Sequence, residues 1–260
     1  MKLSIITINY NNARGLETTL ASLPWGLDDF ESIVVDGGSS DDSLDVAQSY
    51  VERGARLISE PDEGVYDALN KGIRLAKGEF LSFMNSGDSF ETGVLPPVLD
   101  ELTGKAVFYG DRYVGPKRGL TKYPKQFRVH HMFTGLRGLC HQTMFVPRLL
   151  FEEIGLYDDS MLIVADWCWN LEALMRPDVP FVHLERVVCH YEGGGVSSAE
   201  SPLHAKGDEE KLGFLKRQYP DVYEDWLDYA RLLQEESKRR SSGIYRWADR
   251  IFDWKNSRRG

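Results

Sequence analysis

Residues 3–24, LSIITINYNNARGLETTLASLP, contain the first strand and the first helix that we expect in this chain. The run 3–8 is apolar and rich in β-branched residues, which is typical of a buried strand. Asn11 or Asn12 is suited to cap a helix, and the leucines that follow recur at helical spacing up to Pro24. A buried strand that runs directly into an amphipathic helix is the repeating unit of an α/β sheet.

The same unit recurs along the first hundred residues. Apolar strands are predicted at 32–35, 56–58 and 80–84, and helices at 41–51 and 65–76. This alternation predicts a doubly wound, mainly parallel α/β sheet of the Rossmann-like kind. In such sheets ligands bind beyond the carboxyl ends of the strands.

Polar residues gather at those carboxyl ends. The four strand ends carry Asn9-Tyr10, Asp36-Gly37-Gly38-Ser39, Glu60-Pro61-Asp62 and Asn85-Ser86-Gly87-Asp88. Each stretch alone reads as a turn or a helix cap. Because the carboxyl ends of parallel strands meet at one edge, we expect these groups to converge on a single rim that forms a binding site.

The rest of the chain is less regular up to about residue 146. Beyond that point we expect a short helix at 149–155, a longer one at 164–176, a hairpin of 181–184 with 187–191, and polar helices at 202–218 and 219–237. We interpret 1–236 as one domain, with a first half (1–102), a second half (103–200), and a C-terminal helical extension that ends in a basic tail (237–260).

Charge and composition exclude several classes of protein. The net charge is -9, divided into about +6 for 237–260 and about -15 for the remainder; an acidic body argues against nucleic acid as a partner. The sequence contains no run of 18 apolar residues, so we expect no transmembrane helix. The first residues are too polar for a signal peptide. The 3 cysteines are widely spaced and form no CxxC pair, which favours the reducing cytoplasm.

The familiar phosphate-binding loops are missing from the sequence. Neither GxGxxG after the first strand nor GxxxxGK[ST] occurs. Six other stretches, taken in order, resemble those of the family 2 glycosyltransferases of the GT-A fold: LSIITINYNN, SIVVDGGSSDDS, ISEPDEGVYDALNKGI, GEFLSFMNSGDSF, CHQTMFVPRLLFEEIGLYDD and MLIVADWCWNLEAL. The resemblance covers roughly residues 1 to 195 and is strongest to enzymes of exopolysaccharide assembly, such as the colanic-acid type.

The resemblance implies a site for a nucleoside diphosphate-sugar: 1–102 would be the nucleotide-sugar-binding half, and 103–200 the acceptor or catalytic half. Thr7 and Tyr10 match positions that line the base and ribose, and Asp36 matches the carboxylate that accepts the base N–H, which uracil and guanine both offer. Lys71 either meets a phosphate or pairs with Asp67 one helical turn away. The full predicted set is Thr7, Asn9, Tyr10, Asp36, Gly37, Ser39, Asp62, Tyr66, Asp67, Asn70, Lys71, Asn85, Ser86, Gly87, His141 and Gln142.

The resemblance also implies a divalent metal, Mn²⁺ or Mg²⁺, that screens the departing diphosphate. Asn85-Ser86-Gly87-Asp88 falls where the family carries its Asp-X-Asp or Ser-Asp-Asp metal motif. Here Gly87 replaces the first Asp, so Asp88 is the expected ligand. His190 is a candidate further ligand, and Glu192 has a weaker claim.

An inverting transfer needs a general base that takes the proton of the acceptor hydroxyl. Asp166, in Val164-Ala165-Asp166-Trp167, matches the family's base at the start of a helix. A helix N-terminus keeps such a carboxylate ionised. From the local sequence alone, Asp166 is equally suited to be an ordinary helix cap.

The tail carries a second pattern. Ile244, Trp247, Ala248, Ile251 and Trp254 share one helical face beside basic residues. This pattern fits a helix on an anionic membrane surface at the inner face of the cytoplasmic membrane, and equally a helix that packs on the body of the domain. The family's polyprenyl-linked saccharide acceptors agree with the membrane reading.

The leading hypothesis is a metal-dependent, inverting glycosyltransferase that uses a UDP- or GDP-sugar in bacterial surface-polysaccharide assembly. Two alternatives remain open. One is a nucleotidyltransferase, although Asn9-Tyr10-Asn11-Asn12 lacks the glycine-rich basic loop of that class. The other is a non-catalytic scaffold that binds a sugar nucleotide or polysaccharide, an alternative that Gly87 keeps open.

Overall fold

The computed structural model of the chain describes residues 1–115, 119–133, 138–193 and 204–241. The chain divides into two compact units, Met1–Lys211 and Leu212–Gly260. All candidate site residues lie in the first unit. The domain boundaries predicted at 102, 200 and 236 remain predictions.

The first half of the chain alternates strands and helices as predicted. Asn12 caps the first helix, because its side-chain oxygen accepts a hydrogen bond from the backbone N–H of Gly15 at 3.0 Å. The elements, in order, are β1 (Leu3–Asn9), α1 (Ala13–Ala21), β2 (Phe30–Asp36), α2 (Ser43–Val51), β3 (Arg56–Ser59), α3 (Val65–Leu75) and β4 (Phe80–Phe83).

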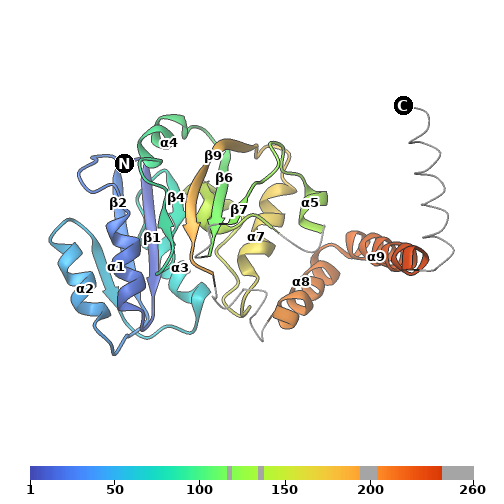
Figure 1. Cartoon of the computed structure of the whole chain (residues 1–260), viewed down its shortest axis with the longest axis horizontal. Coiled ribbons are helices and arrows are strands. Elements are labelled where there is room, and N and C mark those ends of the chain that lie inside the picture. Colours follow the sequence, from blue (N-terminus) through green and yellow to red (C-terminus); the bar gives the residue numbers. More distant parts are fainter. Residues whose placement is uncertain (116–118, 134–137, 194–203, 242–260) are drawn as a thin grey trace. The chain divides into compact units, whose positions relative to one another are not determined.

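These strands pair in parallel in the order β3-β2-β1-β4 (Figure 1). Neighbouring residues of a strand point to opposite faces of a sheet. Ile5 of β1 shares a core cluster with Leu16 of α1 and Ala47 of α2, whereas Ile6 lies against Gly72 of α3. Helices α1 and α2 therefore cover one face and α3 the other, which is the doubly wound arrangement.

The second half extends the same sheet and introduces antiparallel pairing. Strand β8 pairs antiparallel with both β4 and β6, while β6 and β9 run parallel, so the sheet order is β3-β2-β1-β4-β8-β6-β9-β5. The α/β class is confirmed. The elements are β5 (Ser89–Phe90), α4 (Leu95–Glu101), β6 (Val107–Val114), β7 (Gly119–Thr121), α5 (Val129–Phe133), the 3-10 helix η2 (His141–Thr143), β8 (Met144–Pro147), α6 (Arg148–Glu153), α7 (Ala165–Leu174) and β9 (Phe181–Tyr191).

The hairpin predicted within 181–191 is wrong. These residues form the single strand β9, and both of its halves pair with β6 rather than with each other. The register shifts between the pairs Tyr109–His183 and Asp111–Val187, and Glu185 has φ of 50°. The apparent turn is therefore a β-bulge, which sequence alone does not distinguish from a hairpin because both interrupt the apolar alternation.

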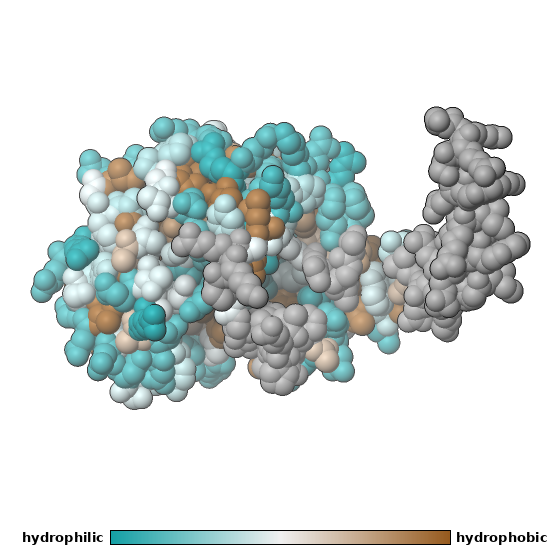
Figure 2. All heavy atoms as spheres, in the orientation of Figure 1, coloured by the Kyte–Doolittle hydropathy of each residue, from teal (hydrophilic) through white to brown (hydrophobic). Residues whose placement is uncertain are grey.

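The predicted C-terminal helices are present as α8 (His204–Gln218) and α9 (Pro220–Ser241). The amphipathic face predicted at 244–254 lies outside the described residues. Among the helices that are described, none combines the length and apolarity that crossing a membrane would take. On the face shown in Figure 2, hydrophilic residues cover most of the coloured surface and hydrophobic residues appear in separate groups between them.

Candidate active site

The carboxylate of Asp36, at the end of β2, is the centre of the rim. Its Oδ1 accepts hydrogen bonds from Asn9 Nδ2 (2.9 Å) and Ser39 Oγ (2.5 Å). Its Oδ2 accepts from the backbone N–H groups of Gly38 (3.2 Å) and Ser39 (2.9 Å) and from Ser59 Oγ (2.9 Å). Burial acts to raise the pKa of Asp36, but the hydrogen bonds outweigh it, and the pKa is lowered.

The loop after β4 joins the same network. Ser86 Oγ donates to Asn9 Oδ1 at 2.8 Å and to the carbonyl oxygen of Ile8 at 3.0 Å. Asn9, Asp36 and Ser59 therefore connect the ends of β1, β2 and β3, and Ser86 joins them from the segment after β4, as predicted for a shared rim. Thr7 lies inside β1 and is fully buried, and its hydroxyl has no hydrogen-bond partner in the described structure.

A cleft of about 470 Å³ opens beside this network, lined by Tyr10, Gly37, Gly38, Pro61, Asp62 and Gly64. The Tyr10 side chain is 66% exposed. Asp62 is held by the backbone N–H of Gly64, which donates to Oδ1 at 3.1 Å. A Cβ added at Gly37 would lie 2.2 Å from Asp62 Oδ2, so the Asp62 carboxylate occupies the space that a side chain at position 37 would take.

Asp88, the predicted metal ligand, is buried just before β5. Its Oδ2 accepts a hydrogen bond from Gln142 Nε2 at 2.7 Å, and its Oδ1 accepts one from the backbone N–H of Glu192 at 2.9 Å. Burial raises the pKa of Asp88 to about 6, although both hydrogen bonds favour the ionised form. A carboxylate has about four acceptor positions, so each oxygen retains capacity for another partner.

Gly87 has φ of 104°, a backbone conformation that glycine adopts without strain. A Cβ added there would lie 2.1 Å from Glu192 Oε2. The Glu192 carboxylate thus fills the space that a side chain at position 87 would take. Thr19 of α1 fixes the loop, because its hydroxyl donates to the carbonyl oxygen of Asp88 at 2.6 Å and accepts from Gly87 N at 3.0 Å.

Asp166, the predicted general base, is the second residue of α7. Its Oδ1 accepts from Tyr66 OH at 3.0 Å and from the backbone N–H of Trp167 at 2.9 Å, and its Oδ2 lies 3.1 Å from Nδ1 of His141. Burial acts to raise the pKa of Asp166, but the interactions with His141 and Tyr66 lower it more, so the carboxylate is ionised. The side chain remains 22% exposed.

The short helix η2 connects Asp166 to Asp88. His141 contacts Asp166, and the next residue, Gln142, donates to Asp88. The two carboxylates predicted to carry the chemistry are therefore held by adjacent residues. Nε2 of His141 is buried and has no hydrogen-bond partner in the described structure.

The four predicted residues of α3 have protein partners. Lys71 Nζ lies 3.1 Å from Asp67 Oδ2 and 3.2 Å from Glu60 Oε1, which is the ion-pair reading of Lys71. Asn70 is buried, and its amide bonds both to the carbonyl oxygen of Tyr157 (2.8 Å) and to its N–H (3.0 Å). Tyr66 bonds to Asp166, as described above.

His190, the candidate further metal ligand, is paired elsewhere. Its Nε2 lies 2.9 Å from Oε2 of Glu91, and its ring stacks on Tyr113 with centroids 5.2 Å apart. Within the described ranges, no group of three or more His, Cys, Asp or Glu side chains is arranged to hold a metal ion. Asn85 retains a buried side-chain oxygen without a partner in the described structure.

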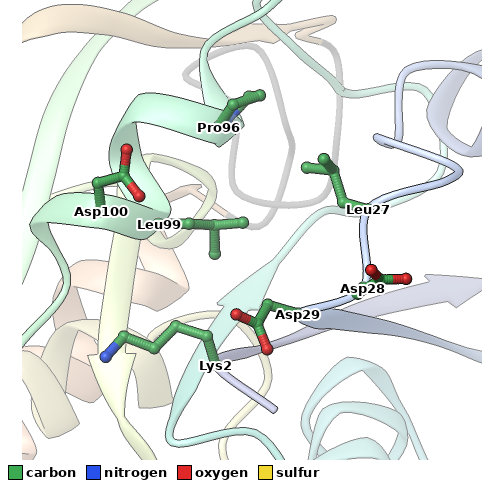
Figure 3. Close-up of a pocket in the computed structure, with 7 residues that line it drawn as sticks. All are labelled: Lys2, Leu27, Asp28, Asp29, Pro96, Leu99 and Asp100. Atoms are coloured by element: carbon green, nitrogen blue, oxygen red, sulfur yellow. The ribbon is translucent and has the colours of Figure 1, made fainter.

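A second hollow, of about 430 Å³, lies at the opposite edge of the sheet. Figure 3 shows its side chains coming from three segments: Lys2 just before β1, Leu27, Asp28 and Asp29 before β2, and Pro96, Leu99 and Asp100 of α4. Because ligands of such sheets bind at the carboxyl ends of the strands, we assign no function to this hollow.

Sequence reasoning missed two residues that shape the site. Ser59 is one of the donors to Asp36, and Thr19 holds the Asp88 loop. Both lie in ordinary strand or helix patterns. Only their positions in the sequence could have identified them as site residues. Ser59 is the last residue of a strand that ends at the rim. Thr19 is a polar residue on the buried face of α1.

The doubly wound sheet with its polar rim is the arrangement of the GT-A fold. The glycosyl transferase family 2 model matches residues 4–152, and the chain belongs to that family.

Curated relatives agree with this assignment. The chain is 34% identical over 226 residues to an uncharacterized glycosyltransferase of Mycobacterium tuberculosis, covering 84% of this chain and 85% of the relative. It is also 35% identical over 178 residues to a PGL/p-HBAD biosynthesis glycosyltransferase of Mycobacterium bovis, covering 65% of this chain and 68% of the relative.

Solved structures share the fold. TarS 1-349 of S. aureus, in complex with UDP-GlcNAc, aligns with a TM-score of 0.63 and 19% identity over 85% of this chain and 73% of that structure. The mannosyltransferase PcManGT of Pyrobaculum calidifontis, in complex with GDP-Man and Mn²⁺, aligns with a TM-score of 0.55 and 14% identity over 94% and 82%.

Proposed function

We propose that this chain is an inverting glycosyltransferase that transfers a sugar from a nucleoside diphosphate donor to a saccharide acceptor. The observation that carries the proposal is the environment of Asp166. It is an ionised and partly exposed carboxylate, oriented by Tyr66 and His141 at the start of α7. A base fixed by two side chains is suited to take a proton at a defined position.

In the proposed reaction, Asp166 accepts the proton of the acceptor hydroxyl while that oxygen attacks the anomeric carbon. The bond between this carbon and the diphosphate oxygen breaks, and the nucleoside diphosphate leaves with the electron pair. Tyr66 donates to the same carboxylate, so it orients Asp166 but also reduces its basicity. Attack from the side opposite the leaving group inverts the anomeric configuration.

The donor proposal draws on the similar structures. TarS is solved with UDP and with UDP-GlcNAc, and PcManGT with GDP-Man. We propose that the rim and the cleft beside Tyr10 bind the donor of this chain, a UDP- or GDP-sugar. Exposed aromatic and backbone surface in the cleft suits a base and a ribose.

The residues also suit a divalent metal, Mn²⁺ or Mg²⁺. Asp88 would hold it, and the Glu192 carboxylate, placed against Gly87, lies beside the same loop. Such ions bind through one or two carboxylates while phosphates and water complete the coordination. When bound, the metal would neutralise charge on the diphosphate.

We further propose a lipid-linked saccharide as acceptor and a role in bacterial surface-polysaccharide assembly, at the inner face of the cytoplasmic membrane. The support is the basic tail and the relative in PGL/p-HBAD biosynthesis. The sugar and the linkage are not part of the proposal.

The test is a panel of UDP- and GDP-sugars, incubated with Mn²⁺ or with EDTA, in which release of the nucleoside diphosphate is measured. We expect at least one donor to release its nucleoside diphosphate with Mn²⁺ present, and we expect EDTA to suppress that release. Donor binding without release, even when saccharide acceptors are added, would instead support the non-catalytic scaffold. Release of pyrophosphate from a nucleoside triphosphate and a sugar phosphate would identify a nucleotidyltransferase.

A further inference from the structure

The carboxylate at the end of β2 is poorly placed to meet a nucleobase. Asp36 is 0% exposed, and its two oxygens already accept five hydrogen bonds from the protein. A carboxylate offers about four acceptor positions. A base N–H would therefore have to displace a rim hydrogen bond in order to reach Asp36.

The neighbouring position has no side chain of its own. Gly37 follows Asp36 and lines the open cleft. The Asp62 carboxylate fills the space that a side chain at position 37 would take, because a Cβ added to Gly37 would lie 2.2 Å from Asp62 Oδ2. Within the described ranges, the one hydrogen bond to Asp62 goes to Oδ1, from Gly64. Oδ2 consequently offers acceptor capacity inside the cleft.

An aromatic ring adjoins the same point. Tyr10 Cδ2 lies 3.4 Å from the Cβ that would be added at Gly37, and the Tyr10 side chain is 66% exposed. The ring and the Asp62 carboxylate thus adjoin the same glycine and line the same cleft. Any base can stack on an aromatic ring, so selection of one base over another has to come from the carboxylate.

We propose that Asp62, rather than Asp36, accepts the ring N–H of the donor's base, and that Asp36 is a positioning residue that holds the rim. The inference rests on the proposed function, because it takes the cleft to be the base site. Its ligand class is a nucleotide whose base carries a ring N–H at its pairing edge, as uracil and guanine do. Cytosine and adenine present an unprotonated ring nitrogen there and would face the carboxylate with an acceptor.

The experiment measures binding of UDP, GDP, CDP and ADP by isothermal titration calorimetry, to the full chain and to two variants. Asp62→Asn keeps the shape of the side chain but adds an N–H donor, and Glu63→Gln removes the adjacent exposed charge as a matched control. For Asp62→Asn we expect a loss of about 10- to 100-fold for the preferred nucleotide, as for a lost hydrogen bond to a charged group. The preference over CDP or ADP should fall by at least as much.

Each result decides the inference. The inference is supported if Asp62→Asn loses its preference for the favoured nucleotide over CDP or ADP while Glu63→Gln keeps the affinities of the unmodified chain. A general loss of structure would instead weaken the binding of all four nucleotides equally. An unchanged preference in Asp62→Asn overturns the inference and leaves the proposed function standing. Failure of the unmodified chain to bind any of the four nucleotides overturns both.

Discussion

At the scale of single residues, two glycines shape the site through the carboxylates that take their place. Asp62 fills the space beside Gly37, and Glu192 fills the space beside Gly87. In both cases an acidic group from a distant segment lies where a side chain on the strand-end loop would be. The Asp62 and Glu192 carboxylates therefore add to the negative charge that Asp36 brings to the rim.

Removing the proposed base should stop the chemistry and leave binding intact. For Asp166→Asn we expect turnover to fall by about 10²- to 10⁴-fold, because general-base catalysis contributes that much. The affinity for the donor, measured by calorimetry, should change less than about threefold.

Glu172→Gln, which removes a carboxylate on the same helix α7, serves as the control and should retain most activity. Near-normal turnover in Asp166→Asn would refute the assignment. A parallel loss of donor binding would indicate that Asp166 has a structural role.

Metal binding should depend on pH through Asp88, whose pKa is raised to about 6. Below that pH the carboxyl group is protonated and the metal must displace the proton, so affinity weakens by about tenfold per pH unit. Above about pH 7 the carboxylate is ionised and affinity should level off. Titrating Mn²⁺ from pH 5 to 7.5 with a diphosphate-sugar present measures this.

The Asp88→Asn variant is the reference for that titration, because its affinity should be weak at every pH. Equal Mn²⁺ affinity at pH 5 and pH 7.5 in the unmodified chain would contradict the role of Asp88 as a ligand.

At the scale of elements, short connections hold the two halves of the site together. Helix η2 contributes His141 to Asp166 and Gln142 to Asp88. Helix α3 contributes Tyr66 to Asp166, and its Asn70 bonds the backbone of Tyr157. The residues proposed for the metal and for the general base are thus positioned by the same packed elements.

Asn70→Ala tests whether that residue is structural or binds nucleotide. The variant leaves a buried N–H and carbonyl of Tyr157 without partners, so the free energy of unfolding should fall by about 2–4 kcal/mol. Urea denaturation measures the loss, and nucleotide affinity at low temperature should stay within about threefold.

Asn170→Ala is the matched control, because Asn170 is also buried but makes a longer bond of 3.5 Å. It should cost less stability. Lost nucleotide binding with unchanged stability in Asn70→Ala would support the role in nucleotide binding predicted for Asn70 from the sequence.

At the scale of the whole molecule, charge is the organising property. An anionic surface repels the acidic residues 1–236, whose net charge is about -15. It attracts the basic segment 237–260, whose net charge is about +6. A basic segment with tryptophans suits the interface of an anionic bilayer, and a lipid-linked acceptor would be found there.

Deleting 240–260 should abolish binding to liposomes that contain anionic lipid, because each basic residue near such a surface contributes about 1 kcal/mol. Cosedimentation at low and high salt measures this, with zwitterionic liposomes as the control. Turnover with a water-soluble acceptor should be unchanged. Undiminished liposome binding by the truncated chain would exclude the membrane role and favour the reading in which the tail packs on the domain.

The sequence by itself determined the order of strands and helices in the first half of the chain, the rim and the family. Apolar periodicity and capping are local, so Leu3–Asn9 and the helix capped by Asn12 could be read directly. The carboxyl ends of parallel strands meet for geometric reasons, so the convergence of Asn9, Asp36 and Ser86 could be predicted as well.

Only the tertiary structure decided which polar groups are already satisfied. Asp36 and Asp62 read alike as acidic residues near strand ends, yet the first is buried among five donors and the second lies in an open cleft. His190 likewise is paired with Glu91, 99 positions away. Such partners come together through loop packing over long sequence separations, and local periodicity carries no information about them.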